Sequence, residues 1–188
     1  TLAASAHKFG GPRGTGLLLA KRTPAPKPVY FGGGQERGIR PGTVNVAGAA
    51  GLAAALREAV QEQERAAART AQLRDRLRSF IITHIDDVVV NTPESALPTH
   101  LHVSFLGTDG DSLIMLMDRA GIAVSTGSAC AAGVNRFSHV LEAMGVDDAR
   151  AHGALRFSVG YTTTEQDIDE VCRQLPEIIA TARKVSDL

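Results

Sequence analysis

A long helical pattern at about residues 46–83 constrains the fold of this 188-residue chain more than any other feature. The stretch is rich in Ala, Arg, Glu, Gln and Leu. Within it, Leu73, Leu77, Phe80 and Ile81 recur at spacings of three or four residues, which is typical of one face of an α-helix. A run of this length predicts two helices, or one bent helix that spans two parts of the molecule. Its Arg/Glu-rich portion, 57–78, predicts a solvated face.

Downstream of this helix, strand and helix patterns alternate, which predicts an α/β fold with a two-layer domain after about residue 45. Asp109 or Asp111 is expected to cap a helix, and Pro176 to kink or interrupt the last one. The predicted strands are Val88–Val90, Leu101–Phe105, Ile122–Val124 and Leu155–Val159, and the predicted helices are Asp109–Ala120, Asn135–Met144 and a last one that opens at Thr162–Glu165.

Composition excludes several classes of protein. Lys and Arg number 20 and Asp and Glu number 20, so the basic excess of a nucleic-acid binder is absent. No stretch approaches the roughly 18 apolar residues of a membrane span. The two cysteines, Cys130 and Cys172, cannot form a disulfide-dense secreted scaffold, and we therefore expect a cytoplasmic location. They lie in no metal-ligand spacing, and no metal site is expected.

The first 22 residues predict two strands around a glycine-rich turn. Lys8 lies at the end of the first strand-like stretch, close to Ser5 and His7. A lysine held at a strand end beside anion-binding donors suits a Schiff base to pyridoxal phosphate, because the amine must be positioned and partly desolvated to act as a neutral nucleophile. The alternative is an ordinary solvated lysine at a turn.

A Pro-rich connector, 23–28, leads into a glycine-rich loop at Gly32–Thr43. This loop carries Arg37, Arg40 and Thr43. Exposed backbone N–H groups, two guanidinium groups and a hydroxyl suit a phosphate, although the loop could also be a plain surface linker. The sequence has neither a Walker A loop nor a dinucleotide-binding fingerprint.

The two cysteines have different surroundings. Cys130 lies in Ser125–Gly133, a segment with little apolar bulk, where a thiol is available for chemistry; the alternative is a small buried residue. Cys172 shares a helical core spacing with Ile168 and Leu175. We therefore expect Cys130 to be the reactive cysteine and Cys172 to serve packing.

Arg156 interrupts an apolar strand pattern. Leu155 and Phe157 point to one face and Arg156 to the other. An arginine in such a strand needs a partner, which is either an acid of the protein or the carboxylate of a substrate held by a bidentate clamp. His100 and His102 share a strand face, and without a third ligand nearby we interpret them as ordinary strand residues.

Four motifs occur in a fixed order: Ser5-Ala6-His7-Lys8 before a glycine turn, Gly32–Thr43, Ser125–Cys130, and Leu155–Ser158. Together they resemble the C-terminal half of a cysteine desulfurase of the NifS/IscS type, in the class-V aminotransferase family of pyridoxal-phosphate enzymes. The resemblance covers nearly the whole chain. The stretch that follows Cys130 resembles the long catalytic loop of the IscS-like branch.

This resemblance implies a fold and an assembly. The fold is that of the fold-type-I pyridoxal-phosphate transferases. Residues 1–45 would be the end of the large cofactor-binding domain, and residues 46–188 the small C-terminal α/β domain that carries the catalytic cysteine loop. The enzyme would be a cytoplasmic homodimer.

The resemblance also implies an active-site role for six residues, in a reaction that takes sulfur from L-cysteine and leaves L-alanine. The sulfur, held as a persulfide, would pass to an iron–sulfur scaffold or another acceptor protein. Lys8 would bind the cofactor, Ser5 and His7 its phosphate, Thr43 the phosphate of the neighbouring subunit, Arg156 the substrate carboxylate, and Cys130 the sulfur.

Two alternatives stay open. One is another fold-type-I enzyme, either a selenocysteine lyase or an aminotransferase; the latter would not need Cys130. The other is a non-catalytic module that binds an iron–sulfur assembly partner. The N-terminal half, which in this family holds the cofactor ring, is not in this sequence. We therefore expect the chain to be a fragment that cannot desulfurate cysteine alone.

Overall fold

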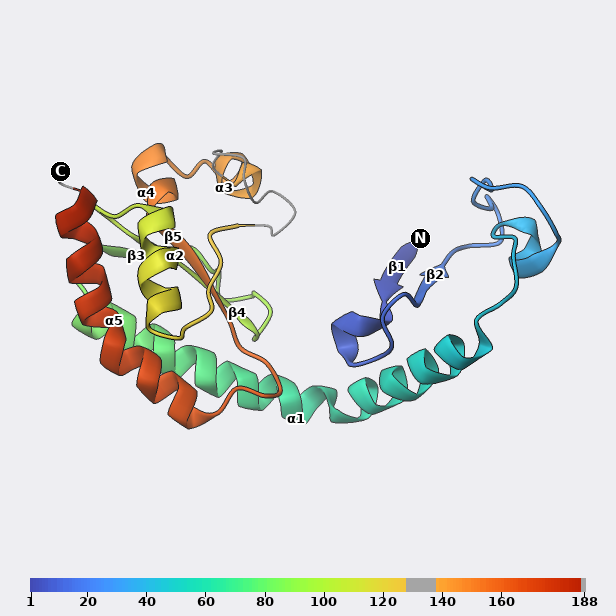
Figure 1. Cartoon of the computed structure of the whole chain (residues 1–188), viewed down its shortest axis with the longest axis horizontal. Coiled ribbons are helices and arrows are strands. Elements are labelled where there is room, and N and C mark those ends of the chain that lie inside the picture. Colours follow the sequence, from blue (N-terminus) through green and yellow to red (C-terminus); the bar gives the residue numbers. More distant parts are fainter. Residues whose placement is uncertain (128–137, 187–188) are drawn as a thin grey trace. The chain divides into compact units, whose positions relative to one another are not determined.

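The computed structural model describes residues 1–127 and 138–186 (Figure 1). The chain divides into two compact units, Thr1–Glu64 and Arg65–Leu188, called here the N-terminal and C-terminal units. In the described ranges, no helix has both the length and the apolar character to cross a membrane.

The N-terminal unit begins with a small antiparallel pair, β1 (Leu2–Ser5) and β2 (Gly16–Leu19), in which Ser5 lies opposite Gly16. A 3-10 helix, η1 (Ala6–Phe9), follows β1 and ends at Gly10, whose φ of 88° is left-handed. This conformation favours glycine. The strand–turn–strand arrangement predicted for the first 22 residues is confirmed, with η1 as an addition.

The long helical pattern forms one helix, α1 (Val46–His84), of 39 residues. The Asn45 side chain accepts a hydrogen bond from the Gly48 backbone N–H at 2.9 Å, as an N-cap does. A Cβ atom at Gly48 would lie 2.5 Å from Thr15 Oγ1. The first turn of α1 therefore lies so close to the glycine-rich turn before β2 that only glycine fits at position 48.

Both compact units include part of α1, because the division between Glu64 and Arg65 falls inside this helix. The expectation of a helical segment that spans two parts of the molecule is confirmed. The boundary that we predict at residues 45 and 46 coincides with the start of α1 rather than with the division of the units. The assignment of 1–45 and 46–188 to two domains stays a prediction.

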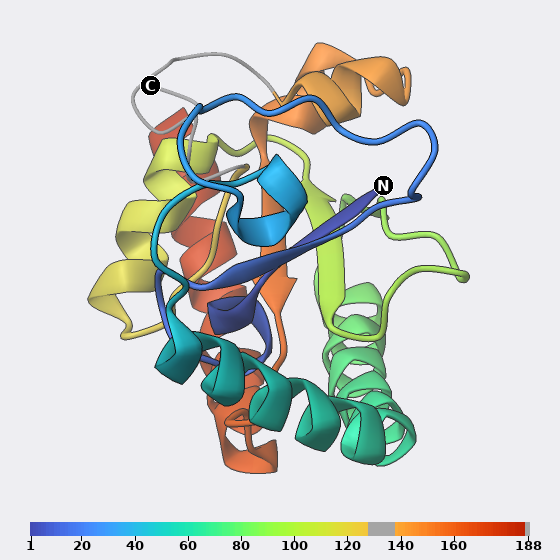
Figure 2. The same cartoon turned by 90° about the vertical axis from the view of Figure 1, so that its right-hand side faces the viewer.

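The C-terminal unit contains one antiparallel sheet in the order β3-β4-β5. Its strands are β3 (Val88–Val90), β4 (His100–Phe105) and β5 (Ala154–Ser158), and β4 and β5 lie side by side (Figure 2). Three of the predicted strands are therefore confirmed, although β4 and β5 each begin one residue earlier than expected and β5 also ends one residue earlier.

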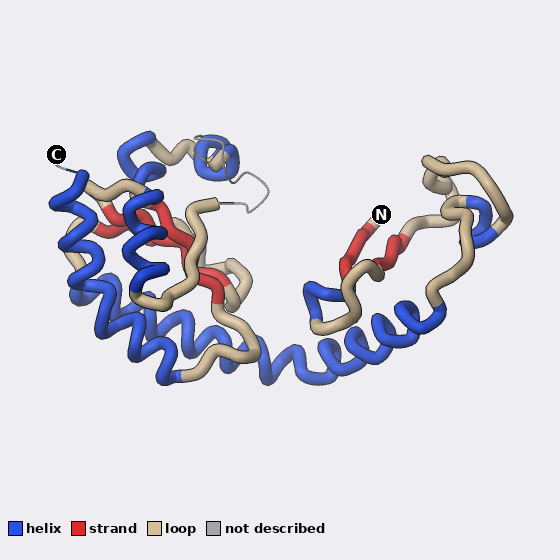
Figure 3. The backbone as a smooth tube through the Cα atoms, in the orientation of Figure 1, coloured by secondary structure: helices blue, strands red, loops and turns tan. Residues whose placement is uncertain are grey.

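One face of this sheet carries the core. Figure 3 shows the helices α2 (Gly110–Arg119) and α5 (Glu165–Ser186) along the strands. The C-terminal half of α1 is the third helix that contributes side chains to this core. This one-sided cover is the predicted two-layer arrangement. The buried side chains include Leu73, Leu77, Ile81, Leu101, Val103, Phe105, Leu113, Met117, Leu155, Phe157, Leu175 and Ile179.

The helix ends follow local signals in part. Asp109 caps α2, since its carboxylate accepts from the Ser112 N–H at 2.9 Å, as predicted. The helix expected at 135–144 is α3 (His139–Ala143) in the described part of the chain. The short helix α4 (Asp148–His152) is not among the predicted elements, although Asp147 caps it by accepting from the Arg150 N–H at 2.9 Å.

The predicted strand at 122–124 is wrong. The Ile122 N–H bonds to the Met117 carbonyl at 2.9 Å and so closes the end of α2. Only Ser125, the next residue, pairs with β5, in an isolated bridge to Arg156. The chain therefore joins the sheet at Ser125, beyond Ile122, whose backbone N–H is bonded to the end of α2.

Pro176 does not interrupt α5, which continues to Ser186. Proline removes one N–H donor from a helix. The neighbouring Leu175, Ile178 and Ile179 are buried against the core, and their packing holds the backbone helical on both sides. Of the two predicted effects, the interruption is wrong because tertiary packing outweighs the local preference, and a kink at Pro176 stays a prediction.

Candidate active site

Three of the predicted cofactor residues lie on one short segment of the N-terminal unit. Ser5 ends β1, and His7 and Lys8 lie in η1. All three are exposed, and the Ser5 side chain makes no capping hydrogen bond to η1. An amine, an imidazole and a hydroxyl with free donors form a set that fits a phosphate-bearing aldehyde such as pyridoxal phosphate.

Lys8 differs from the sequence expectation in one respect. A Schiff-base lysine is expected to be partly desolvated, yet within this chain its side chain is exposed. Among the described residues, no hydrogen bond or ion pair involves its ammonium group. The N-terminal unit therefore positions the amine but does not itself supply the desolvation.

The glycine-rich loop contains a short 3-10 segment, η2 (Gln35–Gly38). Glu36 and Arg37 have left-handed φ values of 50° and 59°, a conformation that is unfavourable for residues other than glycine. The Gln35 side chain accepts a hydrogen bond from the Gly42 N–H at 3.2 Å and so ties the two ends of the loop together. Thr43 follows directly and is exposed.

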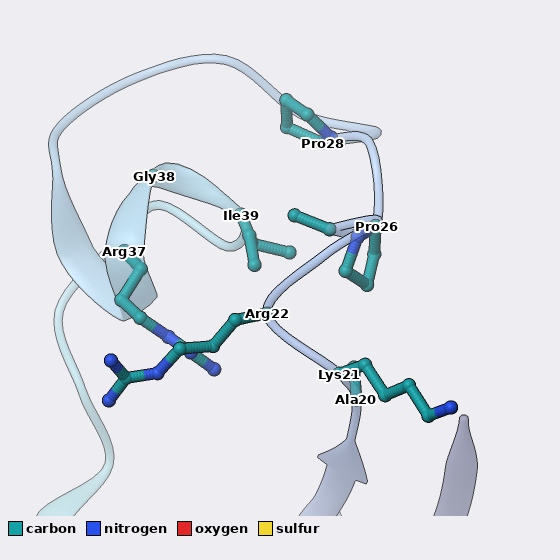
Figure 4. A pocket seen from close by; sticks show the side chains of 9 residues that line it. Ala20, Lys21, Arg22, Pro26, Pro28, Arg37, Gly38 and Ile39 are labelled. Carbon is teal, nitrogen blue, oxygen red and sulfur yellow. The ribbon is translucent and has the colours of Figure 1, made fainter.

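A cavity of about 500 Å³ lies between this loop and the connector after β2 (Figure 4). Arg22 and Arg37 both line it, whereas Lys21 points away in this view. The two guanidinium groups, one from the loop and one from the segment after β2, give the cavity the positive charge that an anion requires. The lining residues are Ala20, Lys21, Arg22, Ala25, Pro26, Pro28, Arg37, Gly38 and Ile39.

In the C-terminal unit, Arg156 lies on the face of β5 opposite the core. Its backbone bridges to Ser125, with hydrogen bonds of 2.7 and 3.2 Å. Its Nε is buried and has no hydrogen-bond partner. In the described ranges, none of the ion pairs includes Arg156. A structural ion pair is thus not seen there, and the clamp for a carboxylate stays a prediction.

Asn91, which follows β3, organises the same face of the sheet. Its side-chain nitrogen donates to Ser104 Oγ at 2.8 Å and lies 3.1 Å from His102 Nδ1. Its oxygen accepts from Arg150 Nη2 at 2.9 Å. Ser104 has no solvent exposure. A connected polar network therefore lies beside Arg156.

His102 is the titratable member of this network. Burial, and next the charge of Arg156, lower the pKa of His102 below its ordinary value of 6.5. Both effects disfavour the imidazolium form. The ring is therefore neutral at physiological pH.

The structure describes one of the two cysteines. Cys130 lies outside the described residues, and its role stays a prediction. Cys172 is half-buried on α5 and packs against the core, which confirms its expected packing role. Burial raises the pKa of the Cys172 thiol.

The remaining predicted residues are divided between the units. Ser5, His7, Lys8 and Thr43 belong to the N-terminal unit and Arg156 to the C-terminal unit. The roles given to these residues stay predictions.

The sequence pattern does not reveal the network around Asn91. It indicates an ordinary strand residue at His102 and singles out neither Asn91 nor Arg150. Period-two alternation predicts only that His102 and His100 share one face of their strand. The pairing of β4 with β5 places His102 directly opposite Arg156 on the face away from the core. Within the residues described, no cluster of side chains could hold a metal ion.

The model of the family described as aminotransferase class-V matches residues 1–171. The chain is 48% identical over 187 residues to an IscS-like cysteine desulfurase of Mycobacterium tuberculosis, covering 98% of this chain and 48% of that protein. It is 38% identical over 186 residues to the cysteine desulfurase NifS of Azotobacter vinelandii, covering 98% and 46%. The chain thus spans about half the length of the curated relatives it matches.

Solved structures show the same likeness. A NifS-like protein, 39% identical, superimposes with a TM-score of 0.83 over 95% of this chain and 46% of that one. A NifS-like protein of Rickettsia africae, 28% identical, gives the same TM-score, also over 95% of this chain and over 47% of the other. The arrangement of strands and helices described above is therefore one that occurs in NifS-like proteins.

Proposed function

We propose, because this chain belongs to the class-V aminotransferase family, that it forms part of a cysteine desulfurase that removes sulfur from L-cysteine and leaves L-alanine. The observation that carries the proposal is the place of Arg156. Its guanidinium lies on the open face of the sheet, and its backbone is bonded to Ser125, where the segment that leads to Cys130 begins. The bridge between Arg156 and Ser125 supports a substrate carboxylate bound close to the segment that leads to Cys130.

Pyridoxal phosphate is the cofactor of this family, and when bound it supplies an electron sink for the substrate. The donors of Ser5 and His7 would hold its phosphate, and Lys8 its aldehyde carbon. The Lys8 amine would also move protons at the carbons of the substrate. The exposure of all three side chains in the N-terminal unit leaves them available for these contacts.

Arg156 would orient the substrate through its carboxylate. A guanidinium binds a carboxylate with two parallel hydrogen bonds, which fix both position and direction. None of the ion pairs in the described part of the chain includes Arg156, so no carboxylate of the protein competes for its guanidinium there. Such positioning converts the attack on sulfur into a step within one complex.

Cys130 would take the sulfur. Its thiolate attacks the sulfur atom of the substrate, so that an S–S bond forms while the C–S bond breaks and its electron pair goes to the carbon, which is then protonated. The products are a Cys130 persulfide and L-alanine. Five peptide units separate Cys130 from Ser125, a span of about 17 Å for an extended chain. This covalent limit supports the role proposed for Cys130 beside a substrate held by Arg156.

The proposal extends to an assembly. We expect a homodimer in which Thr43 contacts the cofactor phosphate of the other subunit, and transfer of the persulfide sulfur to an iron–sulfur scaffold or another acceptor protein. The exposure of Thr43 in this chain supports such a contact. A cytoplasmic location stays a prediction from composition.

The test measures sulfide and alanine produced from L-cysteine by the full-length protein with pyridoxal phosphate. Cys130→Ser should lower turnover by at least about a hundredfold, since the nucleophile is lost. Cys172→Ser, the matched control, should stay within about twofold of the natural protein. Full activity of the Cys130→Ser variant would instead favour an aminotransferase, and retained binding of a partner with no cofactor on Lys8 would favour a non-catalytic module.

A second experiment concerns the chain by itself. Residues 1–188, supplied with pyridoxal phosphate and L-cysteine, should release no sulfide above background. The exposed Lys8 lacks the desolvation that its chemistry needs. Robust turnover by this chain alone would show that residues 1–188 contain a complete site.

A further inference from the structure

His102 and Arg156 occupy directly opposite positions on β4 and β5. Opposite residues of an antiparallel pair have Cβ atoms about 5 Å apart. On its other side, Arg156 pairs with Ser125, whose hydroxyl already donates to the Gly127 carbonyl at 2.6 Å. Of these two neighbours, His102 is the one whose polar group can serve a ligand held by Arg156.

Arg150 fixes the orientation of the Asn91 amide. A guanidinium only donates hydrogen bonds, so the Asn91 atom at 2.9 Å from Arg150 Nη2 must be the oxygen. The amide NH₂ then faces the opposite way and donates to Ser104 Oγ at 2.8 Å. The reversed amide would place donor against donor at Arg150.

The fixed amide determines which ring nitrogen of His102 carries the proton. His102 Nδ1 lies 3.1 Å from Asn91 Nδ2, and because an amide nitrogen only donates, Nδ1 must accept. The proton of a neutral ring is then on Nε2. Among the described residues, the ring makes its side-chain hydrogen bond through Nδ1 alone. The Nε2–H group is left as a donor beside Arg156.

We propose that His102 is a second substrate-binding residue, which donates a hydrogen bond from Nε2–H to the carboxylate held by Arg156. The inference rests on the proposed function and adds a residue to its substrate site. A neutral donor next to a permanent cation suits a carboxylate, because one oxygen can pair with the guanidinium while the other accepts from the imidazole. The buried Arg156 Nε that lacks a partner shows that this corner of the sheet has unused donors.

The size of the effect follows from hydrogen-bond strength. A hydrogen bond to a charged group changes affinity by about tenfold or more. Removing the donor should therefore weaken binding of molecules that carry the carboxylate. It should leave molecules without this group unaffected.

The binding experiment uses the full-length protein with its cofactor and two probes, L-alanine and ethylamine, the latter being L-alanine without its carboxylate. We expect His102→Leu to weaken L-alanine binding about tenfold and to raise the KM for L-cysteine by a similar factor, with kcat changed less than about threefold. His102→Gln should recover most of the affinity, because its amide N–H₂ extends to the region of Nε2. Ethylamine should bind equally to all variants.

His100 provides the matched control, since it shares the face and strand of His102 but lies opposite Ser158. Its Nδ1 is 2.7 Å from Thr99 Oγ1. His100→Leu should leave L-alanine affinity within about twofold of the natural protein. Equal losses in His100→Leu and His102→Leu would overturn the proposal, because the effect would then be a general disturbance of β4.

A measurement on the unsubstituted protein avoids any failure of a variant to fold. Nitrogen NMR of the histidine rings should find the His102 proton on Nε2, with a shift that moves on addition of L-alanine and not of ethylamine. A proton on Nδ1, or no response to L-alanine, would refute the proposal.

The two proposals fail in different ways. Binding of L-alanine through His102 without sulfide release from L-cysteine would overturn the desulfurase proposal and leave this one standing. Sulfide release together with unchanged L-alanine affinity in His102→Leu would overturn this one alone.

Discussion

Replacing Gly153 by alanine should displace the strand that carries Arg156. Gly153 joins α4 to β5, and a Cβ atom at this position would overlap the Phe105 carbonyl oxygen and lie 2.5 Å from Thr108 Oγ1. Ordinary contacts begin at 3.4 Å. Because the first obstacle is backbone, no side-chain rotation can remove the clash, and the start of β5 has to move away from β4.

The cost can be worked from the contacts that this movement threatens. The Phe105 N–H donates to the Gly153 carbonyl at 2.9 Å, and the Thr108 hydroxyl donates to the Phe105 carbonyl at 2.6 Å. A buried hydrogen bond left unmade costs about 1–3 kcal/mol, and overpacking costs about 1–3 kcal/mol. Alanine gains back about 0.5 kcal/mol through the unfolded chain. The expected loss in the free energy of unfolding is about 3 kcal/mol.

Amide hydrogen exchange measures this locally. The Phe105 amide should exchange about a hundredfold faster in Gly153→Ala, since exchange follows the free energy of opening. Gly160→Ala is the control, because a Cβ atom at Gly160 meets no heavy atom within 4 Å. It should change stability by less than about 0.5 kcal/mol. Equal exchange at Phe105 in the two variants would refute the steric argument.

Three further predictions concern titratable groups. Asp109→Ala should lower the free energy of unfolding by about 1 kcal/mol at neutral pH. Burial opposes ionisation of Asp109, but hydrogen bonds from Ser112 outweigh it and lower the pKa of this carboxyl below 3.8. Urea unfolding at a series of pH values should therefore show the difference between the two proteins shrinking as the carboxylate is protonated in acid. His102, its pKa lowered by burial and by Arg156, should titrate below 6.5 by NMR, and stability should fall as the pH drops below 6.5 because the unfolded ring takes the proton first; a midpoint at or above 6.5 contradicts this. Cys172, its pKa raised mainly by burial, should react with iodoacetamide at about pH 8 more slowly than the same residue in the unfolded protein, as peptide mass spectrometry will tell.

Local patterns predicted much of the fold because they act over a few residues. The spacing of Leu73, Leu77 and Ile81 predicted the buried face of α1, and Asp109 predicted the start of α2. The α/β class and the class-V aminotransferase family are both confirmed. The errors were the strand at 122–124 and the interruption at Pro176. They arose where a neighbouring element supplied a hydrogen bond or a packing surface that the local sequence does not contain.

The sequence by itself determined the chemistry available to this protein: an amine at Lys8, a thiol at Cys130 and a guanidinium at Arg156, in an order that identifies the family. The tertiary structure alone decided which residue lies beside Arg156. Strand register is set by pairing between segments about fifty residues apart, so that His102 faces Arg156 only once β4 and β5 have joined. The proton position on that ring depends in turn on Asn91, held by a side chain from α4, and such long-range contacts leave no periodic trace in the chain.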